Sequence, residues 1–131
     1  MKLTPEEVLE GNQLIADFMG VTLEGSERNG FFYVGVPEPF TRHLGYHASW
    51  DWMMPVAEKI NAMGKAFSLA VFKNYVSLTI EKGGKFYKDF SYSHAEYITA
   101  EQTGKIAMFK LLVSFVKWQN EQERNNNLKT E

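Results

Sequence analysis

His43, His47 and Asp51 follow one another at four-residue intervals and form the clearest candidate for chemistry in this sequence. On a helix, this spacing would place two imidazoles and a carboxylate on one face, where they could bind zinc. Gly45 and the prolines before it favour a loop over residues 43–48, and Asp51 also suits the start of a helix. We therefore expect loop and capping roles for these residues, and we predict no metal site and no cofactor.

Acid–base catalysis is a second chemistry to weigh. His47 and His94 are candidate partners for Asp51 or Glu96. A catalytic site, however, needs a nucleophile, a base and a group that orients them. Because these roles cannot all be assigned, we predict no catalytic residue and expect a protein that is not an enzyme.

Aromatic side chains beside the histidines indicate a binding surface. Trp50 and Trp52 are two residues apart at a helix start and therefore point in different directions. One of them could anchor the core while Trp50, with Tyr46, stays partly exposed. Exposed aromatic rings stack on bases, sugars or partner side chains. The interpretation we favour is that both tryptophan rings belong to the core or seal the helix to the sheet.

A basic segment with interleaved aromatic residues, EKGGKFYKDF, occupies positions 81–90. Its Gly83-Gly84 pair could contact a phosphate. Without the strand, loop and helix context of a phosphate loop, the pair is more typical of a hairpin turn. A small-ligand or nucleotide binder, or an enzyme processing such a ligand, would need this segment to meet His47, Trp50 and Asp51 in one pocket.

Composition narrows the classes of function. The 131 residues are 44% hydrophobic and 15% aromatic, which is enough for one buried core. The net charge of −2 argues against binding of extended nucleic acid. Cysteine is absent, which excludes disulfides and thiolate metal sites. No apolar run approaches the roughly 20 residues that span a bilayer, so we expect a cytoplasmic protein without a membrane partner.

Helices are predicted over 5–19, 51–63 and 100–120. The first has Thr4 as N-cap, Glu7 in capping-box position and Gly20 as its stop. The third is apolar around more than half of its circumference, up to and including Trp118. Such a helix is either central or shared with a partner, for instance in a homo-oligomer. Residues 121–131 are polar and are predicted to be a disordered tail.

The second helix has two possible caps. Asp51 as cap would place Pro55 near the first turn, whereas Ser49 as cap should make Pro55 kink the helix. Gly64 is predicted as its left-handed stop. Its core-facing stripe should comprise Trp52, Val56, Ile60 and Met63.

Strands are predicted on both sides of the second helix. Residues 21–36 read as a hairpin around Asn29-Gly30. The segment that begins at Lys65 alternates as a three-stranded antiparallel meander with turns at Lys73-Asn74 and Gly83-Gly84. Small or polar residues at alternate positions predict that one sheet face is partly polar; they are Ser68, Ser77, Thr79 and Glu81. The fold class is α+β, with three helices on a largely antiparallel sheet in one domain over 1–120.

A resemblance to a known family covers most of residues 5–120. It rests on the Met19-Gly20 pair at the end of the first helix, the Ser49-Trp50-Asp51 start of the second, and the run Val56, Glu58, Lys59, Ile60. In these features the chain resembles the phage ABA sandwich domain family, small proteins of phages and prophages. Pro55 and the doubled tryptophan depart from that pattern. The resemblance implies an α/β sandwich encoded by a mobile element and carries over no site residues.

We expect a non-enzymatic binding or inhibitory accessory protein, of phage or prophage origin, that acts on a host protein. The expectation rests on the absence of an assignable catalytic set and on surplus apolar surface near Trp50 and along the last helix. A structural subunit of a homo-oligomer, joined through that helix, is a further alternative. The candidate ligand- or partner-binding residues are Tyr46, His47, Trp50, Lys85 and Trp118.

Overall fold

The computed structural model describes residues 3–63, 67–71, 75–82, 85–93 and 100–130, and it is an α+β fold as predicted. In chain order its elements are α1 (Pro5–Met19), β1 (Thr22–Ser26), β2 (Gly30–Val34), α2 (Trp50–Ala62), β3 (Phe67–Val71), β4 (Tyr75–Lys82), β5 (Lys85–Ser93) and α3 (Ala100–Thr130). The strands form two antiparallel sheets, β1–β2 and β3–β4–β5.

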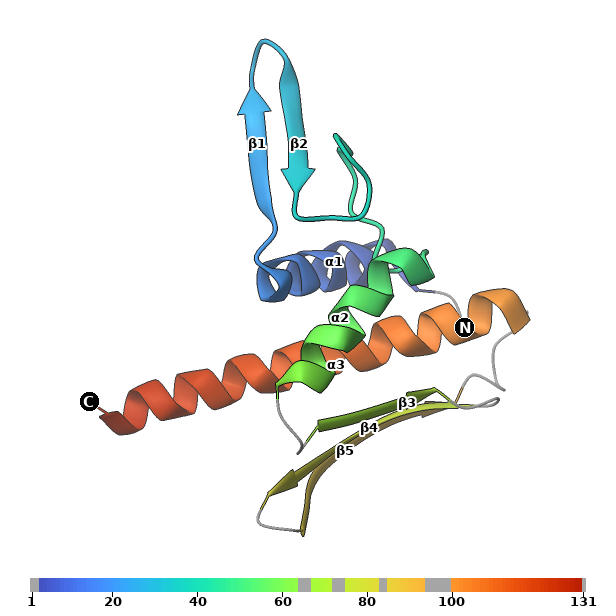
Figure 1. Cartoon of the computed structure of the whole chain (residues 1–131), viewed down its shortest axis with the longest axis vertical. Coiled ribbons are helices and arrows are strands. Elements are labelled where there is room, and N and C mark those ends of the chain that lie inside the picture. Colours follow the sequence, from blue (N-terminus) through green and yellow to red (C-terminus); the bar gives the residue numbers. More distant parts are fainter. Residues whose placement is uncertain (1–2, 64–66, 72–74, 83–84, 94–99, 131) are drawn as a thin grey trace.

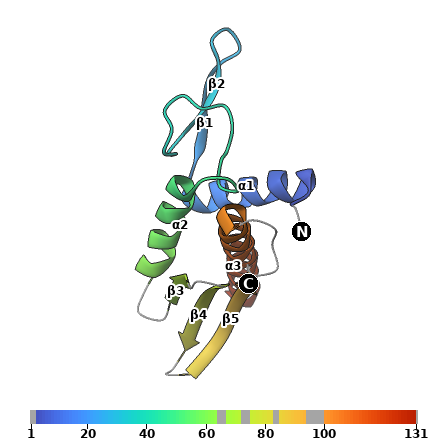
Figure 2. The ribbon, with the colours of Figure 1, turned by 90° about the vertical axis from the view of Figure 1, so that its right-hand side faces the viewer.

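Helix α3 is the middle layer of the molecule (Figures 1 and 2). The β3–β4–β5 sheet covers one side of α3, and α1 lies on the opposite side. Helix α2 packs against both β3 and α3. The β1–β2 hairpin projects from α1 away from the sheet. Because α1 packs on α3, two helices, α2 and α3, lie directly on the sheet rather than the predicted three.

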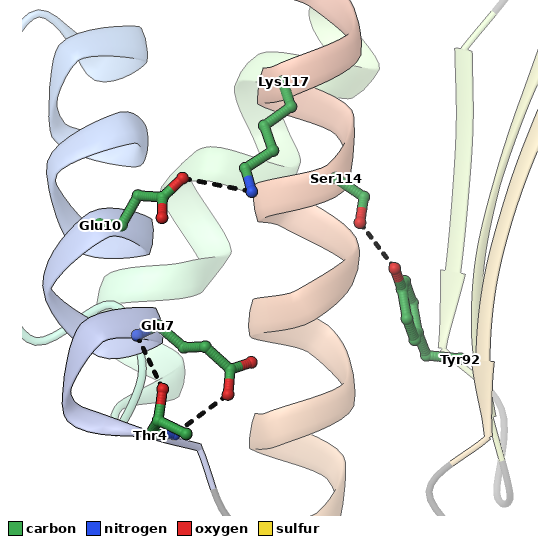
Figure 3. A network of polar contacts seen from close by, with 6 residues as sticks. All are labelled: Thr4, Glu7, Glu10, Tyr92, Ser114 and Lys117. Carbon is green, nitrogen blue, oxygen red and sulfur yellow. Dashed lines mark hydrogen bonds and ion pairs between the residues drawn. The ribbon is translucent and has the colours of Figure 1, made fainter.

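Helix α1 begins and ends where the sequence predicts. The Thr4 backbone N–H donates to Glu7 Oε1 and the Glu7 N–H donates to Thr4 Oγ1, both at 3.1 Å, which completes the capping box (Figure 3). Gly20 follows the helix in the left-handed conformation, with φ 74°. Gly11 faces α3 so closely that an added Cβ would lie 2.4 Å from Phe109 Cζ. The absence of a side chain there allows the two helices to pack.

Helix α2 starts one residue earlier than predicted because Ser49 is the N-cap. Pro55 therefore lies inside the helix, where its missing N–H leaves the carbonyl four residues earlier without its usual helical donor. Met63 was predicted to face the core, which is wrong: it is the C-cap, beyond the last buried turn, and is exposed. The predicted stop at Gly64 lies outside the described residues. The buried residues are Trp52, Met53, Val56, Ala57 and Ile60.

The β3–β4–β5 meander confirms the predicted strand order, while both predicted turns lie outside the described residues. Alternate residues of β4 are buried against the helices, and they are Val76, Leu78 and Ile80. Ser77 and Thr79, on the other face, are partly exposed, as the alternation predicts. Phe67 of β3 and Phe90 of β5 pack edge-on to the Phe115 ring of α3, at centroid distances of 5.9 and 6.4 Å.

Helix α3 runs from Ala100 to Thr130. The predicted end near Asn120 is wrong, and residues 121–130, predicted to be disordered, continue the helix. Its apolar residues are buried within the chain, because α1 and the sheet cover opposite sides; they are Ala107, Met108, Phe109, Leu111, Leu112, Phe115 and Val116. The surplus apolar surface that suggested a partner or second copy on this helix is therefore used by the fold itself.

Candidate functional site

Tyr46 and the two tryptophans belong to the packing of the loop and α2. Tyr46 is 1% exposed, so the prediction that it stays partly exposed is wrong. Its ring packs edge-on to buried Trp52 at 5.0 Å, and burial raises the pKa of Tyr46 to about 12. Trp50 is partly buried and lies over Gly104 of α3, whose added Cβ would be 3.3 Å from Trp50 Cζ2. Neither Tyr46 nor Trp52 is available to a ligand.

Trp118 and Lys85 lie on the sheet side of the molecule. The Trp118 ring is partly buried and packs near Phe90 and Phe115, at 6.3 and 6.1 Å. Lys85 opens β5 and pairs with Lys82; its side chain lies outside the described residues. Helix α1 and β5 occupy opposite sides of α3 (Figure 2). Lys85 of β5 and His47, which contacts α1, therefore do not share the pocket that the small-ligand alternative requires.

The three hypothetical zinc ligands, His43, His47 and Asp51, lie in different environments. His43 is exposed in the loop before α2, and Asp51 is exposed in the first turn of α2. His47 is partly buried and turned toward α1. In the part of the chain that the structure describes, no three histidine, cysteine, aspartate or glutamate side chains are grouped to hold a metal ion.

His47 takes part in a hydrogen-bonded contact between the loop and α1. Asn12, buried on α1, accepts a hydrogen bond from the Tyr46 backbone N–H at 2.8 Å through Oδ1. Its Nδ2 donates to the Val8 carbonyl at 2.8 Å and lies 2.9 Å from His47 Nδ1. Because the Asn12 amide is oriented by Tyr46, His47 Nδ1 must accept, which places the proton of the neutral ring on Nε2. Burial lowers the pKa of His47, favouring this neutral form.

A cleft of about 640 Å³ lies between α1 and the loop that follows the hairpin, and we call it the hairpin cleft. Its volume is within the range of small-ligand pockets. Of the candidate binding residues whose side chains the structure describes, His47 lines it. The lining residues are Leu3, Pro5, Val8, Leu9, Asn12, Gln13, Tyr33, Arg42, His43, Leu44 and His47. No periodic pattern in the sequence marks Tyr33 and Arg42, since their position depends on how the loop folds back.

Segment 41–43 is joined to β2 by one backbone hydrogen bond and is held internally by side-chain hydrogen bonds. The Tyr33 N–H donates to the Thr41 carbonyl at 2.9 Å. Thr41 Oγ1 donates to the His43 carbonyl at 3.1 Å and accepts from the His43 N–H at 3.3 Å. The Arg42 guanidinium lies over Gly30, whose added Cβ would be 2.4 Å from an Arg42 nitrogen. These contacts fix one wall of the hairpin cleft.

The β1–β2 hairpin exposes large apolar side chains. Its turn spans residues 27–29, and Gly30 opens β2 with φ 86°. Every residue of β1 is exposed. Phe40 in the following loop has a positive φ of 57° and packs its ring against Phe32 at 5.2 Å. The exposed fractions of the apolar residues are 56% for Leu23, 47% for Phe31, 38% for Val34 and 76% for Phe40; we call these four residues the hairpin surface.

A smaller cleft of about 290 Å³ lies between α1, α3 and β5. Glu10 forms an ion pair with Lys117 at 3.3 Å, and Tyr92 Oη is 2.6 Å from Ser114 Oγ (Figure 3). The hydrogen bond from the Thr4 backbone lowers the pKa of Glu7. These polar groups connect the three elements to one another, so we assign them a structural role.

Comparison with protein-family models, with curated proteins and with solved structures found no match of any kind. The resemblance to the phage ABA sandwich domain family therefore stays a prediction. Within the described residues, no helix combines the length and apolar character needed to cross a membrane.

Proposed function

We propose that this chain is a non-enzymatic accessory protein that binds another protein through the hairpin surface. The observation that carries the proposal is the exposure of four large apolar side chains outside the core, three of them on the β1–β2 hairpin and one, Phe40, in the loop that follows it. Neighbouring exposed apolar side chains, such as Leu23 and Phe31, mark interaction sites, and aromatic residues are enriched in the core of protein interfaces.

The register of the hairpin strengthens this argument. Leu23 pairs with Tyr33 and Gly25 pairs with Phe31, so Leu23 and Phe31 are diagonal neighbours on one face. Val34, opposite Thr22, lies on the other face. An isolated two-stranded hairpin is only marginally stable in water. A hairpin with apolar residues on both faces gains stability when a partner covers them.

The proposed partner is a protein of a host cell, and the proposed source of the chain is a phage or prophage. The resemblance seen in the sequence supports this part of the proposal. The exposed hairpin supports binding in general and does not depend on the origin of the chain.

Site-specific crosslinking in the native cell tests the proposal. A benzophenone amino acid replaces Phe31 or Phe40, and in a control it replaces Tyr75, an exposed aromatic residue of the sheet. We expect one protein to crosslink from positions 31 and 40 and not from 75, and the crosslink to disappear when Leu23 is changed to Asp. Equal crosslinking from all three positions, or none from the hairpin, would contradict the proposal. Crosslinks joining two copies of the chain would favour a homo-oligomer instead.

A further inference from the structure

The hairpin cleft combines apolar walls with an unbalanced positive charge. The chain carries 16 acidic and 14 basic residues, yet none of the described residues lining this cleft is a carboxylate. Arg42 is its one permanently charged lining residue, and Leu9 and Leu44 contribute apolar surface. In the described part of the chain, no carboxylate forms an ion pair with Arg42.

The backbone on both sides of Arg42 is held by hydrogen bonds. Its neighbours Thr41 and His43 are hydrogen-bonded to each other, and Thr41 is joined to Tyr33 of β2. Its guanidinium lies over Gly30. A planar guanidinium can bind a carboxylate through two parallel hydrogen bonds.

The other polar groups of the cleft add neutral donors. Asn12 occupies His47 Nδ1, which leaves Nε2–H as the remaining polar group of the neutral ring. Tyr33 and Gln13 also line the cleft and carry a hydroxyl and an amide. Donors next to a cation and without a nearby carboxylate favour an anionic ligand group.

We propose that the hairpin cleft binds a short segment of the partner protein in which a carboxylate side chain lies between bulky apolar side chains. Arg42 holds the carboxylate, and Leu9 and Leu44 contact the apolar neighbours. This inference rests on the proposed protein-binding function and adds the chemistry of the bound segment. Tyr33 lines the cleft and pairs with Leu23 of the hairpin surface, so one partner can contact both.

A pair of short peptides tests the inference. The probes are acetylated and amidated Leu-Phe-Asp-Phe-Leu and the same peptide with Asn in place of Asp, titrated into the full chain and followed by NMR of its backbone amides. We expect the Asp peptide to shift the amides of Arg42, Leu44 and His47, and to bind about 10- to 100-fold more tightly than the Asn peptide, because a charge-assisted bidentate contact is lost in the latter.

Two matched variants separate the cleft from general electrostatics. Arg42→Gln should remove the preference for the Asp peptide. Arg28→Gln makes the same charge change in the exposed hairpin turn and should leave the preference intact. Arg42→Lys keeps the charge without the planar fork, and we expect intermediate affinity. The lysine variant also keeps the test valid if Arg42→Gln does not fold. The amide spectrum of each variant checks its folding directly.

The outcomes separate this inference from the proposed function. Equal affinity for both peptides, equal loss in the Arg42 and Arg28 variants, or shifts outside the cleft would overturn it. Phenylbutyrate binding at the cleft as tightly as the Asp peptide would show a small-carboxylate site and would also overturn it. Hairpin crosslinks that persist in Arg42→Gln with unchanged yield would leave the proposed function standing and the cleft inference wrong. Binding of the Asp peptide at the cleft without any hairpin crosslink would support the cleft inference and contradict the proposed role of the hairpin surface.

Discussion

Replacing Gly11 with alanine should destabilise the protein, although Gly→Ala inside a helix normally stabilises by about 0.5–1 kcal/mol. The added Cβ would lie 2.4 Å from Phe109 Cζ and 2.9 Å from Val113 Cγ2. Carbon atoms in contact are usually about 3.5–4.0 Å apart, so α1 must retreat from α3 by roughly 1 Å. The Phe109 ring cannot swing away freely, because it is 1% exposed and packs edge-on against His47 at 6.1 Å.

Overpacking of this kind costs about 1–3 kcal/mol. Subtracting the gain in helix propensity leaves a net loss of up to about 2.5 kcal/mol, or a fall in Tm of up to roughly 10 °C for a chain of this size. Urea unfolding followed by circular dichroism measures it. Gly104→Ala is the matched control, because its Cβ would lie 3.3 Å from Trp50 Cζ2. This milder crowding should nearly cancel the gain in helix propensity. In a Phe109→Leu background the Gly11→Ala penalty should shrink. A rise in stability for Gly11→Ala in the native background would refute the reasoning.

Three further predictions concern the loop and the hairpin. Because the pKa of His47 is lowered in the folded protein, the unfolded chain binds more protons than the folded chain as pH falls below about 6.5. The free energy of unfolding should therefore decrease from pH 7 toward pH 5, measured as Tm against pH. A flat profile would contradict this prediction. Asn12→Ala should cost about 2–3 kcal/mol in urea unfolding because the buried Tyr46 N–H loses its acceptor, while Gln13→Ala on the exposed side should cost under about 1 kcal/mol. Gly25→Ala should disrupt the hairpin, because φ is 118° and an added Cβ would lie 2.2 Å from the Gly30 carbonyl oxygen; the hairpin amide shifts should change while the global Tm stays within a few degrees, and unchanged shifts would count against it.

Local signals account for the parts of the fold that the sequence predicted correctly. Thr4, Glu7 and Gly20 act within one turn of the helix they bound, and their roles in the structure match the prediction. The polar composition after Asn120 led to a wrong prediction for the end of α3. The helix continues because no glycine or proline interrupts residues 121–130 and several of these residues form helices readily.

The candidate site depends on contacts between residues far apart in the chain. Tyr46 is buried because Asn12, 34 residues earlier, accepts its backbone N–H. The cleft wall forms because Thr41 returns to Tyr33, and no pattern in the loop sequence indicates that return. Periodicity and capping rules therefore found the elements, whereas the cleft follows from tertiary contacts that those rules do not address.

The β1–β2 hairpin makes its main element contacts within itself, and Val21 and Val36 at its two ends pack against the core. We therefore expect side-chain changes between these two anchors to leave the packing of α2, α3 and the sheet intact. Natural selection can thus vary the side chains of this arm at little cost to folding. A protein built in this way can adapt to changes in its target through a few substitutions, much as an antibody changes its loops on a constant framework.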